Sequence, residues 1–312
     1  MRGGHNRPIH ELYEHVYSEM ARIRRLERVT ETHRPTEIPG EIARSWLLVS
    51  ARRTEQFDSA AKSRADQIVL DIEDAVDPKH KPEARGDVVE WLSQGGSGWV
   101  RINDRASDFW SDDVDELKGV PGLRGVMLAM CESAAVVTVT FDRLGGTTPV
   151  LVLIESALGI EEAVSIARAR GAYRLAFGSG DYRRDTGTSA EDIAMAYPRS
   201  RLVIASRVGK LPGPIDGPTV SSSHPVLREQ SAVAVALGLT GKLCLDVEQL
   251  PVINEVISPT QSDVTWARDF LDDFEARGRV IRDGSDLPRL GRAEKIDKLA
   301  RAFGVEPLPS GR

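Results

Sequence analysis

Charged side chains recur at the ends of short apolar segments, and their types and positions suggest chemistry. Glu155 directly follows a run of five apolar residues, Asp181 comes shortly after another apolar run, and Arg101 ends a third. A carboxylate at the exit of a buried strand is costly to desolvate unless it is paired or bound to a cation. When several strands end in this way, the simplest explanation is one polar site shared by the strands at one face of a barrel.

Glu155 and Asp181 are candidate metal ligands. They would follow the fifth and sixth strands, which are neighbours in a barrel. Two converging carboxylates repel each other, so a proton or a hard cation should lie between them. Because the ligands are oxygens and no histidine is near them in the sequence, we expect Mg²⁺ rather than zinc. A pair of capping or salt-bridged carboxylates is the alternative.

Arg101 and Gly180 are candidates for substrate binding. Gly178 and Gly180 stand where a strand opens into a loop, and glycines there let the backbone approach a ligand, although they can also simply shape a turn. Arg101 is suited to grip a carboxylate or a carbonyl oxygen with two nitrogens. A structural bridge to Glu73 or Asp74 is the alternative role for this arginine.

The segment from Asp71 to Asp74 holds three acids in four positions. They cannot all bind one ion, so we expect Glu73 and Asp74 to orient metal-bound water or Arg101. Asp216, in a Pro-Ile-Asp-Gly-Pro segment, suits a functional role and a turn equally well. Four of the six histidines lie in residues 1–40 and the other two at expected helix starts, and no nucleophile is identified as paired to a base, so a hydrolase triad is not expected.

From Arg44 onward, strand-like and helix-like segments alternate. The strand-like segments are short, apolar and often β-branched, as strands buried on both faces should be. Eight such strands separated by helices favour a closed parallel (β/α)₈ barrel, the TIM-barrel form of the α/β class, over an open sheet. The absence of a Gly-x-Gly-x-x-Gly turn weighs against a dinucleotide-binding domain. The expected strands span residues 45–49, 67–71, 98–102, 124–129, 149–154, 173–178, 201–205 and 242–245.

The chain is expected to have three parts. Residues 1–40 form an N-terminal helical extension and linker, because apolar residues recur at helical spacing and Pro and Gly follow them. Residues 41–259 form the barrel. Residues 260–312 form a C-terminal helical extension, with a helix over residues 263–277, a turn, and a final helix that ends near Phe303.

Composition excludes several classes of function. The 312 residues carry a formal charge of −6 without a basic stripe beyond the N-terminal segment, so nucleic-acid binding is not expected. Cys131 and Cys244 are too few for a disulfide framework or a thiolate zinc site. No apolar run approaches the roughly 20 residues that span a bilayer, and the N-terminus lacks the apolar core of a secretion signal. We expect a cytoplasmic protein that acts on a small-molecule substrate.

Seven short motifs, in their order and spacing, are specific together although each is weak alone. They are Leu70–Val76 (LDIEDAV), Val100–Asn103 (VRIN), Leu153–Gly159 (LIESALG), Phe177–Asp181 (FGSGD), Pro214–Asp216 (PID), Gly241–Cys244 (GKLC) and Pro251–Glu255 (PVINE). On these motifs, residues 44–300 resemble the citrate lyase beta-subunit family, which includes malyl-CoA lyases and other HpcH/HpaI-type aldolases.

The resemblance implies a Mg²⁺-dependent carbon–carbon lyase that works through an enolate in a homotrimer or homohexamer. By motif match, Glu155 and Asp181 would hold the metal, and Arg101 would bind the carboxylate or carbonyl of the substrate. Asp286 in Asp283–Pro288 (DGSDLP) matches, in a shortened form, an aspartate that many members donate to the site of a neighbouring subunit. It would move a proton to or from the nascent carbanion.

Three strand ends depart from the family pattern. The first strand loop keeps Arg53 as a substrate-binding candidate but loses the family's prolines and glycine. Ala129–Met130 replaces Pro-Lys, and Asp246–Val247 replaces His-Pro. The implied substrate is a 3-hydroxyacyl-CoA such as malyl-, citramalyl- or citryl-CoA. Two alternatives are a CoA-independent 2-oxo acid aldolase and a catalytically degenerate barrel that binds a ligand or serves assembly.

Overall fold

A computed structural model describes residues 38–309 of the chain. The N-terminal helix predicted from the spacing of apolar residues therefore lies outside the described residues. Within the described part, no helix has both the length and the apolar character needed to cross a membrane.

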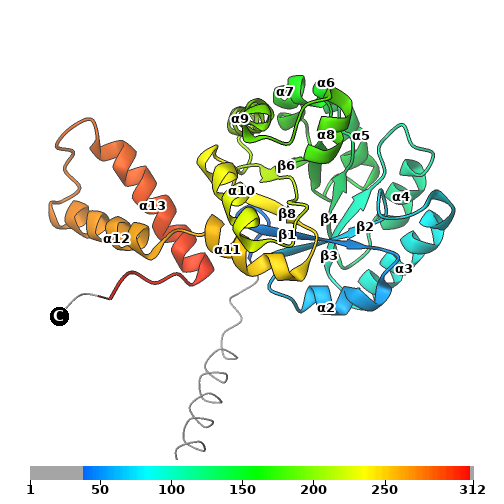
Figure 1. Ribbon diagram of the computed structural model, residues 1–312, viewed down its shortest axis with the longest axis horizontal. Helices are drawn as coiled ribbons and strands as arrows, with labels where there is room; N and C mark the ends of the chain where they lie inside the picture. The colour runs from blue at the N-terminus through cyan, green and yellow to red at the C-terminus, as the bar shows by residue number, and fades with distance from the viewer. Residues whose placement is uncertain (1–37, 310–312) are drawn as a thin grey trace, which may run out of the picture. The chain divides into compact units, whose positions relative to one another are not determined.

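Eight parallel strands close into a barrel in sequence order, with β8 pairing to β1 (Figure 1). Each strand is short and nearly all of its residues are buried, as expected for strands covered on both faces. The predicted (β/α)₈ barrel is therefore confirmed. The strands are β1 (Ser45–Ser50), β2 (Gln67–Asp71), β3 (Gly98–Ile102), β4 (Leu123–Leu128), β5 (Val150–Ile154), β6 (Ala172–Phe177), β7 (Ile215–Asp216) and β8 (Gly241–Cys244).

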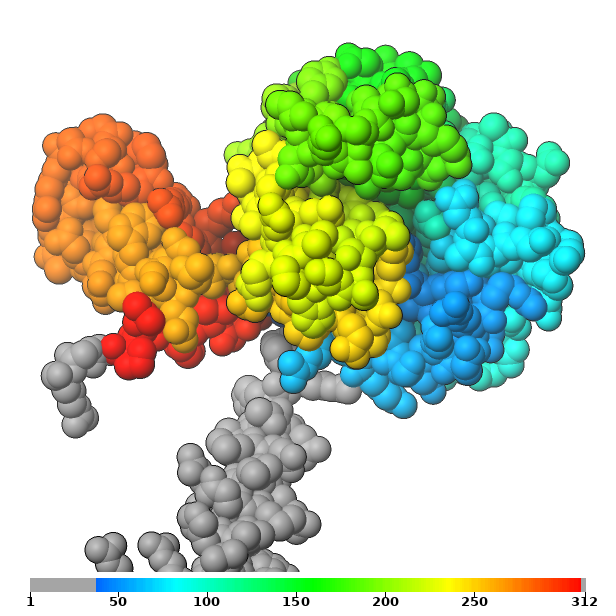
Figure 2. Space-filling view, in the orientation of Figure 1, coloured from blue at the N-terminus to red at the C-terminus, as the bar shows by residue number. Residues whose placement is uncertain are grey.

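Helices follow the strands and cover the outside of the barrel. In Figure 2 the yellow segment that holds α10 and α11 lies beside the green segment that holds α7 to α9. The helices are η1 (Thr54–Gln56), α2 (Phe57–Ala61), η2 (Pro78–His80), α3 (Lys81–Ser93), α4 (Trp110–Leu117), α5 (Ala134–Arg143), α6 (Ala157–Glu161), α7 (Ala163–Ala167), α8 (Ser179–Thr186), α9 (Asp192–Val208), α10 (His224–Ala236), η3 (Val247–Gln249), α11 (Leu250–Ile257), α12 (Gln261–Ala276) and α13 (Asp286–Phe303).

The prediction of a seventh strand at residues 201–205 is wrong. These residues lie in the 17-residue helix α9, and the seventh strand is the two-residue β7. Leu202 and Ala205 are buried whereas Ile204 is 54% exposed, which is the pattern of a helix with one face on the barrel. A short apolar run cannot by itself distinguish a buried strand from a buried helix face.

Alternation along the strands divides the apolar side chains into two layers. One layer packs between the strands and the helices, and it includes Leu70, Val100 and Ile154. The other fills the barrel interior with large side chains, so the barrel is a packed core rather than a pore. The interior cluster contains Trp46, Val69, Trp99, Met127, Leu151, Leu153, Ala176, Ile215 and Leu243.

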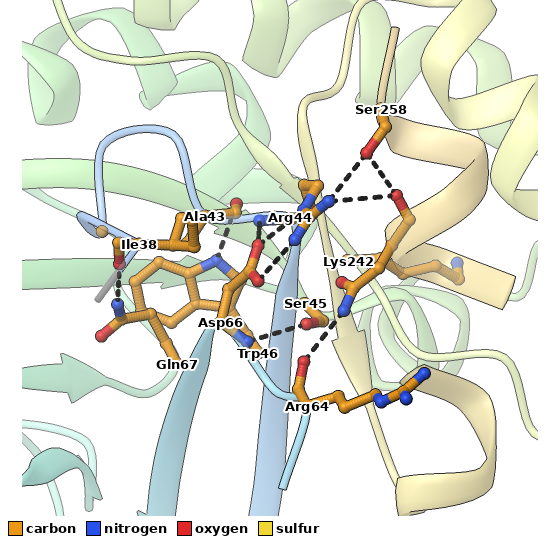
Figure 3. A network of polar contacts seen from close by, with 12 residues as sticks. Ile38, Ala43, Arg44, Ser45, Trp46, Arg64, Asp66, Gln67, Lys242 and Ser258 are labelled. Atoms are coloured by element: carbon orange, nitrogen blue, oxygen red, sulfur yellow. Dashed lines mark hydrogen bonds and ion pairs between the residues drawn. The ribbon is translucent and has the colours of Figure 1, made fainter. Parts of the chain in front are cut away.

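Polar groups at the start of the first two strands are paired with one another. Arg44 donates through Nε and Nη2 to the two carboxylate oxygens of Asp66, each at 2.8 Å. Its Nη1 donates to Ser258 Oγ at 2.7 Å, so Arg44 lies between Asp66 and Ser258 in Figure 3. The guanidinium carbon also lies 4.0 Å from the ring centroid of Phe303. Arg44 thus ties β1 to the segment after α11 and to the end of α13.

The C-terminal residues form a pair of packed helices, α12 and α13. Val264, Ala267 and Phe274 of α12 are buried, as are Ala293 and Ala300 of α13. Thr260 starts α12 with a capping box that it shares with Asp263, which explains why the helix begins there.

Candidate active site

The interior face of the barrel continues into charged residues at the carboxyl ends of the strands. Side chains two residues apart on a strand point to the same face. Asp71 follows Val69 by two residues, Arg101 follows Trp99, and Glu155 follows Leu153, and all three apolar residues belong to the interior cluster. Asp71, Arg101 and Glu155 therefore project into the mouth of the barrel, at the end where TIM barrels carry their active sites.

Arg101 is held by a bidentate ion pair with Asp71. Its Nε donates to Oδ1 at 2.8 Å and its Nη2 donates to Oδ2 at 2.5 Å. Its Nη1 lies 3.3 Å from Oε2 of Glu73 and 3.7 Å from Oδ2 of Asp74. Burial lowers the pKa of Arg101, but the charge and hydrogen bonds of Asp71, with the charges of Glu73 and Glu155, leave it above its ordinary value. The guanidinium therefore stays charged.

Glu155 is a buried carboxyl group, with 3% of its surface exposed. Its Oε1 accepts a hydrogen bond from the Met130 amide at 2.8 Å. Burial raises the pKa of Glu155 to about 8; the Met130 hydrogen bond and the charge of Arg101 lower it, and the charge of Asp181 raises it. A bound cation would favour the ionised form of this carboxyl group.

Glu73 is the second carboxyl group whose ionisation is disfavoured. Burial raises its pKa to about 7, against the charge of Arg101, and the charges of Asp74 and Asp71 raise it further. Its Oε2 accepts the Asp74 amide at 2.8 Å. The ammonium group of Lys81 donates to the Glu73 carbonyl at 2.9 Å and also contacts Asn103 Oδ1, which fixes the loop after β2.

Asp181 lies in the first turn of α8, directly beyond β6. Its Oδ1 lies 2.9 Å from Nη1 of Arg184, and 22% of its side chain is exposed. Because its charge raises the pKa of Glu155, the two carboxyl groups share one electrostatic environment.

These residues fit a magnesium ion. In the described part of the chain, no group of three or more His, Cys, Asp or Glu side chains is arranged to hold a metal on its own. Mg²⁺ does not require such a group, because it keeps several waters and is usually held by one or two carboxylates plus oxygens of the substrate. The buried Glu155 and the partly exposed Asp181 are a donor set of that kind.

The sequence and the fold are similar to those of known lyases. A model of the HpcH/HpaI aldolase/citrate lyase family matches residues 44–247, and a model of the HpcH/HpaI aldolase C-terminal domain matches residues 262–304. The chain belongs to this family. It is a carbon–carbon lyase, since its named relatives are lyases of this kind.

Two relatives and one solved structure illustrate the similarity. The L-malyl-CoA/beta-methylmalyl-CoA lyase of Cereibacter sphaeroides is 29% identical over 86% of this chain and 97% of its own length. A citrate lyase subunit beta-like protein of Mycobacterium tuberculosis is 30% identical over 80% of this chain and 93% of its own length. The crystal structure of the M. tuberculosis protein CitE with magnesium, acetoacetate and coenzyme A has a TM-score of 0.69 at 27% identity, covering 84% of this chain and 99% of that chain.

Asp286, the proton-transfer candidate suggested by the family motif, is part of an ion pair inside the C-terminal helices. Its carboxylate accepts hydrogen bonds from Arg277 Nη1 at 2.7 Å and from the Arg282 amide at 2.8 Å. These hydrogen bonds, that from Arg277 foremost, lower the pKa of Asp286 to about 2. Its role in proton transfer stays a prediction.

Arg53 and Gly180 also stay predictions. Arg53 follows β1 and its side chain is exposed. Gly180 is exposed in α8, and a Cβ atom added to it would meet no atom within 4 Å. The close approach that a glycine permits is found instead at Gly178, where an added Cβ would lie 2.1 Å from Oε2 of Glu155.

Asp216 lies outside the barrel interior. It follows the inward-facing Ile215 by one residue and pairs with Arg199 of α9 at 2.9 Å and with Lys242 of β8 at 2.9 Å. The structure places Asp216 in strand β7 rather than in a turn, and a functional role for it stays a prediction. Asp216 is the buried centre of an ion-pair network that joins β7, β8 and α9.

Asp71 is the site residue that sequence reasoning missed. Among the three acids at the end of β2 and just beyond it, Glu73 and Asp74 were predicted as partners of Arg101, whereas the bidentate partner is Asp71. The alternation of β2 contains the signal, because Asp71 shares its face with Val69, as Arg101 shares its face with Trp99.

We expect Gly178→Ala to impair catalysis because the new methyl group would displace the Glu155 carboxyl group. A shift of about 1 Å in a reacting group can reduce a rate by roughly 10²-fold, so kcat/KM should fall by about that factor. Gly86→Ala, at a helical glycine with no atom within 4 Å of an added Cβ, is the matched control. Equal kcat/KM values for the two variants in steady-state assays would contradict this role for Gly178.

Proposed function

We propose that this chain is a Mg²⁺-dependent lyase that cleaves or forms a 3-hydroxyacyl-CoA such as malyl-, citramalyl- or citryl-CoA. The observation that carries the proposal is the convergence of Arg101 and the buried Glu155 on the interior face of the barrel mouth, with the charge of Arg101 acting on Glu155. The relatives named for malyl-CoA and the CitE structure with magnesium and coenzyme A support it.

The chemistry of such a cleavage defines what the site must do. Breaking the bond between the carbons that become a 2-oxo acid and an acyl-CoA leaves an enolate on the acyl fragment. Mg²⁺ held by Glu155 and Asp181 would supply Lewis-acid polarisation of the 2-oxo acid oxygens. Arg101, oriented by Asp71, would hold a carboxylate or carbonyl oxygen and offset the negative charge that develops in the transition state.

The remaining residues have supporting roles in this proposal. Glu73 and Asp74 flank Arg101 and would orient it and nearby water. Arg53 and Gly180 would contact the substrate beyond the reacting atoms. Asp286 would move the proton in the site of a neighbouring subunit of a homotrimer or homohexamer, and that role requires its ion pair with Arg277 to open.

A CoA-independent aldolase acting on a 2-oxo acid and an aldehyde is the second candidate. It is favoured by the surface at the end of β8, where Leu245 and Val247 are each 47% exposed. These two side chains alternate with the exposed acids Asp246 and Glu248, so the altered segment would offer apolar contacts to a small aldehyde as well as to an acyl group.

A substrate panel separates the two candidates. The purified chain is incubated with Mg²⁺ and malyl-, citramalyl- or citryl-CoA, and in parallel with aldol donors and acceptors without CoA, and released 2-oxo acid is measured. Turnover of one CoA ester that is lost in Glu155→Ala and Asp181→Ala supports the lyase. Turnover restricted to the CoA-free reactions supports the aldolase. If the chain shows neither turnover nor Mg²⁺ binding, a catalytically degenerate barrel becomes the favoured explanation.

We expect Mg²⁺ binding to depend on pH because of Glu155. Burial raises its pKa to about 8, so the carboxyl group is mostly protonated at pH 7 and must lose its proton to hold a cation. Between about pH 6 and 7.5 the apparent Mg²⁺ affinity should rise by roughly tenfold per pH unit, and it should level off above pH 8. Titration calorimetry in buffers of different ionisation enthalpy should show release of about one proton at pH 7. The Mg²⁺ affinity should rise with pH both in the absence and in the presence of the 2-oxo acid pyruvate. An affinity that does not change with pH would contradict this prediction.

A further inference from the structure

Met130 has an unusual backbone conformation at the edge of the site. In residues 38–309, the non-glycine residues with positive φ are Met130 at 45°, Lys210 at 60° and Arg279 at 60°. Lys210 and Arg279 follow glycines just after the ends of α9 and α12, where the left-handed region is common. Met130 instead stands two residues beyond strand β4. A side chain in this region is strained, and such outliers persist where the surrounding structure enforces them.

The conformation of Met130 turns its amide out of the sheet. The Ala129 amide donates to the Ile102 carbonyl at 3.4 Å, and the Cys131 amide donates to the Leu153 carbonyl at 3.1 Å. The amide of Met130, between these two, donates to Oε1 of Glu155 at 2.8 Å. The main chain is thus anchored on both sides of the residue, while its own N–H is directed into the barrel mouth.

The other oxygen of Glu155 is confined by Gly178. An added Cβ at Gly178 would lie 2.1 Å from Oε2 and 2.4 Å from Cβ of Glu155, so the side chain packs directly on the Gly178 backbone. Gly178 is itself fixed by its amide, which donates to the Ile154 carbonyl at 2.9 Å. Glu155 is therefore held from one side by a hydrogen bond and from the other by contact.

We propose that Met130 is a positioning residue whose left-handed backbone aims its amide at Glu155 and fixes the orientation in which that carboxyl group acts. This inference rests on the proposed function, because it concerns the same carboxyl group. It assigns the role to the backbone of Met130 and not to its side chain. The consequence is that residue types should be tolerated according to their ability to adopt positive φ.

Two substitutions at residue 130 test this consequence. Met130→Gly keeps access to positive φ and should retain kcat within about twofold. Met130→Val introduces a β-branched residue that strongly disfavours this region, and kcat should fall by about 10–100-fold while KM changes less. Lys210→Val is the matched control, since it imposes the same backbone conflict at an exposed position of the surface. It should lower thermal stability and leave kcat unchanged.

A spectroscopic readout tests the contact without relying on turnover. The chain has five methionines, so selective ¹⁵N-methionine labelling gives a simple amide spectrum in which Met130 is assigned by its loss in Met130→Leu. The Met130 amide proton should resonate far downfield and move upfield in Glu155→Ala. If it does not respond to Glu155→Ala, and Met130→Val matches wild-type kcat, the proposal is overturned. Absence of wild-type turnover would instead refute the proposed function, and the amide signal would still decide the role of Met130.

Discussion

Arg101→Lys should reduce kcat for carbon–carbon cleavage by about 10²–10³-fold, the range found when one donor to a developing oxyanion is removed. Arg101 uses Nε and Nη2 for Asp71, which leaves Nη1 on the side of Glu73 and the barrel mouth. Lysine keeps the positive charge but cannot bind Asp71 with two nitrogens and still present a third. The loss should therefore appear in kcat measured at saturating substrate and Mg²⁺.

The chain provides a closely matched control for this substitution. Arg44 forms the same bidentate pair with Asp66, and its side chain is 12% exposed, as is that of Arg101. Arg44 precedes β1, whereas Arg101 lies at the carboxyl end of β3. Arg44→Lys should cost stability comparable to Arg101→Lys and leave kcat within about twofold, because charge-assisted bidentate pairs contribute alike at both positions. Equal loss of kcat in both variants would indicate a general folding defect.

Asp216→Ala should destabilise the fold by about 3–5 kcal/mol, the cost of leaving a buried charge without its partner. Asp216 is fully buried, Lys242 is 1% exposed and Arg199 is 7% exposed. The charges of Lys242 and Arg199 hold the pKa of Asp216 below its usual value against the effect of burial, so the carboxylate is ionised in the fold. Its removal leaves Lys242 and Arg199 without this carboxylate partner at the junction of β7, β8 and α9. Urea unfolding followed by circular dichroism gives the change in free energy.

An ion pair at the surface serves as the comparison for the buried network of Asp216. Arg228 donates to both carboxylate oxygens of Glu255, at 3.0 and 2.7 Å, but both side chains are at least half exposed. Removing a pair of this kind costs about 0–1 kcal/mol, because water replaces the lost contact. If Asp216→Ala and Glu255→Ala destabilise equally, the buried network is not the stabilising element that its burial indicates.

The barrel could be predicted from the sequence because its strands carry a strong local signal. Seven of the eight strands are apolar runs bounded by polar residues, and the structure contains each of them at nearly the predicted positions. The seventh failed because β7 has only two residues and therefore has no periodicity of its own. The apolar run at Leu202–Ala205 resembled a strand, since a buried helix face and a short buried strand have the same composition.

The sequence predicted the site residues whose chemical type and position at a strand end both indicate a role. It did not predict which carboxylate forms the ion pair with Arg101. The charges of Arg101 and Asp181 act on Glu155, as their positions at the carboxyl ends of β3 and β6 and that of Glu155 after β5 suggested. The choice of Asp71 over Glu73 as the partner of Arg101 depends on the register of β2 with β3, which pairs Asp71 with Arg101. The amide of Met130 left no trace in the sequence, because a backbone group is present at every residue.

The most direct test of the proposed function is the cleavage of malyl-CoA with and without a free divalent cation, in wild type and in Glu155→Gln. The reaction is followed by the simultaneous release of glyoxylate and acetyl-CoA. Wild type should produce the two in equal amounts with Mg²⁺ and neither in the presence of EDTA, and Glu155→Gln should remain folded without activity. Equal product formation with EDTA, or full activity of folded Glu155→Gln, would contradict the role of Glu155 as a ligand of a catalytic Mg²⁺ ion.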